Sequence, residues 1–355
     1  MKVNGHKLEE LESALRGVRT AGIATLPTPL QEVPRFSRAL GGPRILIKRE
    51  DMTGLATGGN KTRKLEYILG EAIDQGADTL VAGGGSAQSN HARQCAAAAR
   101  ALGMDPILVL RKGPENQRKM QGNLLLDHVL GAEMVLVDED RVQTDSLPRF
   151  GLQYLMEEIA EQRRATGRKP YVLATSSVPL GAVAYAAALV ELFEQCDRSK
   201  VTPNHIFLTS TGSSQAGLAL ASKHIEAPWR VVGIAVASAV PAQETVSRLA
   251  NDAAEVLKLS TRLGPGEVFN QEYSGEGYGI LSDEALEAIH LLARNEGILL
   301  DPVYSGKGMA GLIDNIRTGA LSRDDTVVFV HTGGNTAIFA YADEMTGGSS
   351  YFESP

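Results

Sequence analysis

Short runs of apolar residues alternate with longer segments of helical periodicity along most of the chain. Runs typical of strands stand at residues 79–85, 106–112, 133–138, 171–175, 205–210, 230–238 and 326–335. Helical patterns lie between them at residues 91–103, 181–196 and 215–225. Strands that are apolar throughout are buried on both faces, and their alternation with helices favours parallel order. The pattern therefore predicts an α/β fold with mostly parallel strands in two sheets, flanked by helices.

Composition narrows the class of protein. The chain has 355 residues, 43% hydrophobic and 22% charged, which is ordinary for a soluble protein of one large or two medium domains. A net charge of -7 without any basic run argues against a nucleic-acid partner, and no apolar run is long enough to span a membrane. Cys95 and Cys196 stand far apart in apolar helical contexts, which predicts unbridged core residues. With a polar, acidic N-terminus unlike a signal peptide, these features predict a cytoplasmic protein.

Glycine and small polar residues gather in four of the predicted loops between a strand and a helix. These loops span residues 54–62, 83–91, 209–217 and 331–337. Ligands of parallel sheets bind outside the carboxyl ends of the strands, where such loops converge. Four loops of this kind predict a site for a small, polar, anionic ligand.

The loop "TSTGSSQAG" offers an anion cradle. Gly212, Ser213 and Ser214 stand between a strand and a helix, so free N–H groups and two hydroxyls can face one anion. The alternative is a tight turn with a helix cap. The closest approach to a P-loop, residues 54–62, is one residue too long and has Asn60 where glycine is required, so a magnesium-nucleotide site is not indicated. The Rossmann glycine pattern is absent as well.

The loop "GSAQSNH" places Gln88, Ser89 and Asn90 at another helix start. Ser89 or Asn90 can serve as an N-cap, or the segment can bind a substrate carboxylate at the positive end of the helix. By its place in the first helical turn, His91 fits a structural better than a catalytic role. No G-x-S-x-G elbow, H-E-x-x-H motif or Cys/His ligand spacing is present, so neither a serine hydrolase nor a metal site is predicted.

Lys61 stands at the start of an amphipathic helix, where the helix dipole makes an ammonium group unfavourable. Either this lysine is solvated or its amine is used, and Asn60 before it is a plausible helix cap. In a dry cleft its pKa falls, which suits a nucleophile or base. An amine beside a separate phosphate cradle, without nucleotide signatures, predicts a Schiff base to pyridoxal 5′-phosphate.

Several motifs together resemble the fold-type II pyridoxal phosphate enzymes. They are "LPTPLQEVPRFSRALGG", "IKREDMTGLATGGNKTRKLEY", "QSNHARQCAAAARALG", "TGSSQAG", "GEGYGI", "LLDPVYSGKGMAGLI" and "HTGGNTAIFAY". In order along residues 24–342, they are most similar to the D-cysteine desulfhydrase and 1-aminocyclopropane-1-carboxylate deaminase family, which includes L-cysteate sulfo-lyases. The resemblance implies a tryptophan synthase β-like fold of two domains. The larger would comprise residues 1–61 and 176–355, the smaller residues 62–175, and the protein would form a homodimer.

The resemblance also implies residue roles. Lys61 would hold the cofactor and move the substrate's α-proton, and Asn90 would bond the cofactor's 3′-oxygen. Tyr304 and Tyr278 would be aromatic walls or acid–base groups, which with Lys61 and Ser89 complete the catalytic set. Other cofactor contacts would come from Asn60, Thr211, Gly212, Ser213, Ser214 and Gln215, with Ser305 or Thr332 at the pyridine nitrogen. Substrate contacts would come from Gln88, Ser89, Asn90 and His91.

Two departures from the family bear on the substrate. In the deaminases a glutamate follows the "PVY" tyrosine and keeps the pyridine nitrogen protonated, whereas here Ser305 follows Tyr304. A hydroxyl supplies no charge, which favours β-elimination of a good leaving group over cyclopropane opening. Val178 stands where desulfhydrases tend to have asparagine, so the substrate can differ from cysteine. The hypotheses are thus a β-eliminating lyase, a cyclopropane deaminase, and a non-catalytic protein that binds a phosphorylated metabolite.

Overall fold

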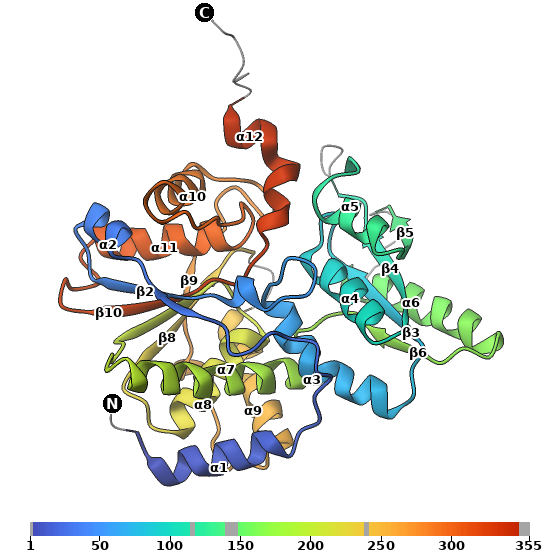
Figure 1. The fold of residues 1–355 in the computed structure, drawn as a ribbon, viewed down its shortest axis with the longest axis horizontal. Coiled ribbons are helices and arrows are strands. Elements are labelled where there is room, and N and C mark those ends of the chain that lie inside the picture. The colour runs from blue at the N-terminus through green and yellow to red at the C-terminus, as the bar shows by residue number, and fades with distance from the viewer. Residues whose placement is uncertain (1–2, 114–117, 139–147, 238–240, 348–355) are drawn as a thin grey trace, which may run out of the picture.

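The computed structural model describes residues 3–113, 118–138, 148–237 and 241–347. Two sheets stand in separate lobes, with α3 (Asn60–Asp74) running between them (Figure 1). The larger sheet has the order β1 (Leu30–Glu32), β2 (Arg44–Lys48), β10 (Thr326–Val330), β7 (His205–Leu208), β8 (Arg230–Ala235) and β9 (Phe269–Glu272). The smaller has the order β5 (Glu133–Val137), β4 (Asp105–Arg111), β3 (Thr79–Gly84) and β6 (Pro170–Leu173). All neighbouring strands are parallel except β1 and β2.

Helices cover both faces of the larger sheet. Ile45 and Ile47 of β2 point into one core and Leu46 into the other, which explains why the strand is apolar at successive positions. The face that carries Leu46 packs against α1 (Gly5–Arg16), α7 (Pro179–Arg198), α8 (Ser213–His224) and α9 (Ala242–Val256). The face that carries Ile45 and Ile47 packs against α2 (Pro34–Leu40), α10 (Asp283–Glu296) and α11 (Ser305–Arg317).

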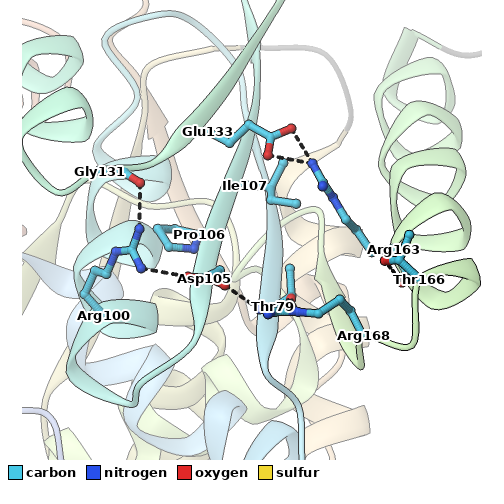
Figure 2. A pocket seen from close by; sticks show the side chains of 10 residues that line it. All are labelled: Thr79, Arg100, Asp105, Pro106, Ile107, Gly131, Glu133, Arg163, Thr166 and Arg168. Atoms are coloured by element: carbon cyan, nitrogen blue, oxygen red, sulfur yellow. Dashed lines mark hydrogen bonds and ion pairs between the residues drawn. The ribbon is translucent and has the colours of Figure 1, made fainter.

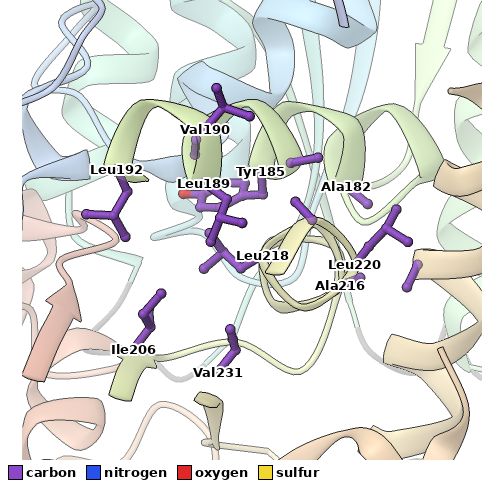
Figure 3. Close-up of a cluster of buried hydrophobic side chains, with 14 of the residues drawn as sticks. Ala182, Tyr185, Leu189, Val190, Leu192, Ile206, Ala216, Leu218, Leu220 and Val231 are labelled. Atoms are coloured by element: carbon purple, nitrogen blue, oxygen red, sulfur yellow. The ribbon is translucent and has the colours of Figure 1, made fainter. Parts of the chain in front are cut away.

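Helices α7 and α8 pack closely against each other in the larger lobe. Figure 3 shows the aliphatic side chains of both helices, among them Leu189 and Leu218, meeting those of the sheet. A Cβ on Gly217 would lie 2.0 Å from the carbonyl oxygen of Ala182, so only glycine allows the backbones to approach this closely. This packing fixes α8, whose first turn faces the edge of the sheet where the loops gather.

The smaller sheet is covered in the same way. On one face lie α3, α4 (Asn90–Ala101) and α5 (Gly122–Val129), and on the other α6 (Pro148–Ala165). The remaining elements are the 3₁₀ turns Glu50–Met52, Pro265–Glu267 and Asn335–Tyr341, and the short α12 (Ala342–Thr346).

The expected α/β fold with two sheets is confirmed. Each predicted strand is present, although the run at 230–238 ends as a strand at Ala235. The sequence analysis did not assign β9, whose polar sequence FNQE lacks an apolar pattern. All four smaller-sheet strands lie within residues 62–175, and the domain boundaries themselves stay a prediction. Cys95 and Cys196 are buried and unbridged. Within the described ranges, no helix has the length and apolar character to cross a membrane.

Candidate active site

The four glycine-rich loops follow β2, β3, β7 and β10 and meet at the carboxyl ends of these strands. The Asn60 N–H donates to the carbonyl of Thr332 at 3.0 Å, and the Asn60 side chain lies 3.4 Å from the Ser214 hydroxyl. A Cβ on Gly334 would lie 2.9 Å from Nδ2 of Asn90 and 2.8 Å from Cγ of Asp301. Each loop therefore touches at least one other, around the start of α3.

The segment before Lys61 has an unusual backbone. Leu55, Ala56 and Thr57 have φ of 47°, 46° and 70°, in the left-handed region that costs L-residues energy. The buried guanidinium of Arg93 holds this segment by donating to the Ala56 carbonyl, to the Thr57 hydroxyl at 2.8 Å and to the Gly58 carbonyl at 3.2 Å. Arg93 belongs to α4, the helix that follows the second loop, so this helix stabilises the strained backbone of residues 55–57.

Asn60 is not a helix cap, contrary to the expectation. Gly59 with φ 127° is the N-cap, and α3 begins at Asn60. The Asn60 amide is instead turned toward Ser214, and its Oδ1 is buried without a partner among the described residues. An unpartnered buried polar atom beside the helix start indicates that the protein atoms alone do not complete this site.

Lys61 lies in the first turn of α3, with its Nζ 5.2 Å from the centre of the Tyr304 ring. The side chain keeps part of its surface accessible, yet protein atoms surround the amine. Burial lowers the pKa of Lys61 to about 8; the Asp301 carboxylate opposes this shift and the Arg93 charge adds to it. About a tenth of the amine is therefore neutral at pH 7, far more than in an ordinary lysine, which suits a nucleophile or base.

Tyr304 and Tyr278 form a pair on one side of Lys61. Their hydroxyls share a hydrogen bond, and their rings stand edge to face with centres 5.9 Å apart. Burial, with the neighbouring Tyr278 and Asp301, raises the pKa of Tyr304 well above its ordinary value. The Tyr304 phenol therefore stays protonated and can donate a proton rather than accept one.

The Ser305 hydroxyl makes two hydrogen bonds to Asp301, one as donor and one as acceptor. Its Oγ donates to the Asp301 carboxylate at 2.6 Å and accepts the Asp301 N–H at 2.7 Å. The same buried carboxylate accepts the N–H groups of Val303, Tyr304 and Ser305, so it holds the turn that leads into α11. With its proton committed, Ser305 can offer only an oxygen lone pair to a ligand.

The predicted phosphate loop begins α8, with Gly212 as its N-cap and Thr211 half-buried before it. The N–H groups of Ser214 and Gln215 lie in the first turn, where the helix supplies no acceptor. The Ser213 hydroxyl instead donates to the Ser176 carbonyl at 3.0 Å. The Gln215 side chain turns toward β9, where it bonds Phe269 and Asn270. The geometry thus leaves backbone N–H groups of this turn for an anion.

The residues proposed for substrate lie at the start of α4. Ser89 is the N-cap and accepts the N–H of Ala92 at 3.2 Å. Both ends of the Gln88 amide are bonded to the start of α5, to the Gln121 carbonyl and the Asn123 N–H. Burial, with the charges of Lys61 and Lys64, lowers the pKa of His91 to about 3, so this ring is neutral. The substrate roles of these residues stay predictions.

Lys64 is a site residue that the sequence analysis missed. It lies one turn after Lys61, is buried, and has its Nζ 5.7 Å from the centre of the Tyr185 ring. The Tyr185 hydroxyl is itself bonded to Ser214, so Lys64 stands beside the phosphate loop. Burial and the Lys61 charge hold the pKa of Lys64 well below its ordinary value. The sequence did contain a signal for Lys64: in "NKTRK" it stands three residues after Lys61, which places both lysines on the same face of the predicted helix.

These features fit an anionic cofactor with an aldehyde. The amines of Lys61 and Lys64 converge with the positive end of α8, so the site can carry positive charge when an anion binds. A phosphate would compensate this charge, and a carbonyl carbon would match the amine of Lys61. The unpartnered Asn60 oxygen and the glycine backbones of the loops leave polar groups for such a ligand.

A hollow of about 360 Å³ lies elsewhere, at the amino edge of the smaller sheet (Figure 2). Its three arginines are already paired. Arg163 bonds Glu133, while Arg100 and Arg168 both bond Asp105. The hollow therefore lies at a surface ion-pair network that joins the strand starts, away from the loops around Lys61.

Comparisons with known proteins agree with this geometry. The family described as "Pyridoxal-phosphate dependent enzyme" matches residues 23–333. A Pyrococcus abyssi protein whose name proposes a 1-aminocyclopropane-1-carboxylate deaminase is 36% identical over 321 residues, covering 90% of this chain and 92% of that protein. A crystal structure described as an ACC deaminase homologue is 37% identical, with a TM-score of 0.85 over 96% of this chain and 99% of that one.

A more distant structure shares the fold alone. A threonine deaminase from T.th. is 22% identical, with a TM-score of 0.62 over 92% of this chain and 98% of that one. The expected family and cofactor are confirmed by the family match together with the two relatives above. The chain belongs to the fold-type II pyridoxal-phosphate dependent enzymes, as a lyase or deaminase that uses pyridoxal phosphate.

Proposed function

We propose that this enzyme is a lyase that eliminates a β-substituent from a small amino acid such as D-cysteine. The products would be pyruvate, ammonia and the leaving group, here sulfide. The observation that carries the proposal is the partly neutral Lys61 amine beside the protonated Tyr304–Tyr278 pair. When bound, pyridoxal phosphate withdraws electrons from the α-carbon of the attached amino acid.

The chain's own groups have separate tasks in this proposal. Lys61 would hold the cofactor at its aldehyde and would accept the α-proton, since its pKa of about 8 lies close to working pH. Tyr304, whose phenol stays protonated, donates a proton to the departing group. Lys64 and the first turn of α8 would bind the phosphate. At the start of α4, Ser89 would bind the substrate carboxylate and Asn90 the cofactor's ring oxygen.

Ser305 supports the choice of leaving group. Its hydroxyl is neutral and donates to Asp301, so it presents no negative charge of its own to a ring nitrogen. A less electron-poor ring suits a substituent that leaves readily, such as sulfide, sulfite or chloride. A cyclopropane bond would require a stronger electron sink.

Deamination of 1-aminocyclopropane-1-carboxylate is the second candidate. It is favoured by the names of the relatives, which point to that substrate at 36–37% identity. The reaction would open the ring and give 2-oxobutyrate and ammonia. A cysteate sulfo-lyase activity would use the same groups as the favoured reaction. The cytoplasmic location and the homodimer are also predictions.

A substrate panel tests the proposal. Holoenzyme is incubated with D-cysteine, L-cysteine, L-cysteate, β-chloroalanine and 1-aminocyclopropane-1-carboxylate, and the keto acid released is identified by mass. We expect pyruvate from D-cysteine to form faster than 2-oxobutyrate from the cyclopropane. The reverse order would assign the second candidate. Tight cofactor binding without any keto acid would instead revive a binding protein. The Lys61→Ala variant is the background for each substrate.

A further inference from the structure

A buried amide, Asn123 in the first turns of α5, stands at the centre of a hydrogen-bond network behind the site. Its Oδ1 accepts from Nε of Arg93 at 2.8 Å and from the Thr336 hydroxyl at 2.6 Å. Its Nδ2 donates to the Gln88 carbonyl and to Oδ1 of Asn90, both at 2.8 Å. Both side-chain polar atoms are thus used twice, which leaves this amide no freedom to turn.

Groups of fixed polarity decide which way the amide faces. A guanidinium can only donate, so the atom of Asn123 that faces Arg93 must be the oxygen. A backbone carbonyl can only accept, so the atom that faces Gln88 must be the nitrogen. These two partners lie on opposite ends of the amide, and they assign the same orientation independently.

This orientation is passed on to Asn90. Because the nitrogen of Asn123 faces Asn90, the Asn90 oxygen must accept from it, and the Asn90 Nδ2 then points away. That nitrogen lies in the space beside Gly334 and Asp301, where the loops after β3 and β10 meet. Across the described part of the chain, no acceptor bonds it.

We propose that Asn123 is a positioning residue that makes Asn90 present an N–H donor, rather than its oxygen, to the cofactor's ring oxygen. The relay runs from Arg93 through Asn123 to Asn90, and each step joins one donor to one acceptor. It rests on the assignment of Asn90 to the cofactor in the proposed function, and it needs no particular substrate. A donor at this place stabilises a negatively charged ring oxygen, whereas an amide oxygen would repel it.

Asn123→Asp is the main test, because it replaces the donor by an oxygen of nearly the same size. The Asn90 amide should then turn over to donate to the new carboxylate, so that its oxygen faces the cofactor. We expect cofactor binding by equilibrium dialysis to weaken about 10- to 100-fold, the range for a hydrogen bond to a charged group. The pH titration of the bound cofactor's visible absorption band should shift as well.

Thr336→Val is the matched control. It removes a second bond to the same Asn123 oxygen, but Arg93 still fixes the amide. Its cofactor affinity and visible titration should therefore match the wild type. A loss in this variant equal to that in Asn123→Asp would show that the network only joins the lobes, and would overturn the relay.

A double-mutant cycle separates positioning from general damage. In an Asn90→Ala background, Asn123→Asp should cost no further affinity, because its effect passes through Asn90. Additive losses would overturn the proposal, as would an Asn123→Asp protein that binds the cofactor like the wild type. If Asn123→Asp does not fold, Asn123→Ala replaces it in the same cycle, with a smaller loss expected. Wild-type protein that binds no cofactor would overturn both the relay and the proposed function.

Discussion

Two kinds of buried cation stand side by side on α3. Arg63 lies between Lys61 and Lys64 in sequence, but it points to a different part of the interior. Its guanidinium bonds Glu50 through two nitrogens, at 2.6 Å and 2.7 Å, and Glu191 at 3.0 Å and 3.1 Å. Although burial opposes its charge, these carboxylates raise the pKa of Arg63 above its ordinary value. Arg63 is thus a paired charge that joins α3 to the 3₁₀ turn Glu50–Met52 and to α7.

The two lysines have no such partners within the residues that the structure describes. Lys61 has only the influence of Asp301, and Lys64 faces the ring of Tyr185. Burial lowers the pKa of both amines. The difference teaches that, within one helix turn, carboxylates from other segments determine whether a buried cation stabilises the fold or stays available for a ligand.

The largest expected effect comes from Lys61→Ala. We expect turnover on the best substrate of the panel to fall about 10⁴-fold, because the variant loses both the attachment point and the proton acceptor. The cofactor's visible absorption band should change and become sensitive to dialysis. Turnover within tenfold of the wild type would contradict the role of Lys61. Lys112→Ala, which removes a surface ion pair with Asp138, is the control and should leave turnover unchanged.

Arg63→Met tests the other side of the comparison. It leaves the fully buried carboxylate of Glu50 without its ion-pair partner, so the free energy of unfolding should fall by about 3–5 kcal/mol. Urea denaturation of cofactor-free protein measures this. Arg317→Met breaks a two-bond pair with Glu287 at the surface and should cost less than about 1 kcal/mol. Equal losses in the two variants would show that burial does not determine how much an ion pair contributes to the free energy of unfolding.

Sequence sufficed for the parts of the site that depend on contiguous residues. Three of the four loops follow apolar strands directly, and parallel strands must bring such loops to one edge. The α3 cap could not be predicted correctly, because Asn60 is a common capping type and nothing local shows its turn toward Ser214. The backbone of Gly59, with φ 127°, takes the cap position instead.

Partners from distant segments were the parts that sequence could not supply. The motif "NKTRK" contains three cations, and only the fold reveals that Glu50 and Glu191 reach the middle one. Asn123 likewise lies in no motif, and its importance follows from the groups that surround it. Hydrogen-bond polarity and charge pairing across loops are set by tertiary packing, which local pattern does not encode.

Lys64→Met sharpens the comparison at a smaller magnitude. Methionine fills the same space without a charge, so the free energy of unfolding of cofactor-free protein should stay the same or rise. Cofactor affinity should fall about 10- to 100-fold, as expected when a charged phosphate contact is lost. Lys48→Met is the matched control, because Lys48 is equally buried but bonds Glu191. The Lys48→Met variant should lose stability and keep its cofactor affinity. If Lys48→Met instead lost cofactor affinity and Lys64→Met lost stability, Lys48 and not Lys64 would be the lysine that binds the phosphate.

Asp127 extends the comparison to a buried anion. This α5 carboxyl is fully buried, neither oxygen has a hydrogen-bond partner among the described residues, and its charged neighbour is Arg93. Burial raises the pKa of Asp127 to about 7, against the opposing influence of Arg93. An unfolded Asp releases its proton near pH 3.9, so the folded state binds the proton more tightly and loses stability as the pH rises from about 4 to about 7.

Asp127→Asn removes this titration. From about pH 5.5 to about pH 8, the free energy of unfolding of the wild type should fall by about 2 kcal/mol relative to the variant, as urea denaturation at each pH would measure. Asp105→Asn is the control, because arginine contacts lower the pKa of that surface carboxyl and it stays ionised throughout this range. Parallel curves for wild type and Asp127→Asn would mean that water or Arg93 solvates the carboxylate fully. The lack of a charged partner would then have consequences only for the two lysines. A bound phosphate can compensate the charge of their amines, and the neutral form of the amine can act as a nucleophile or base.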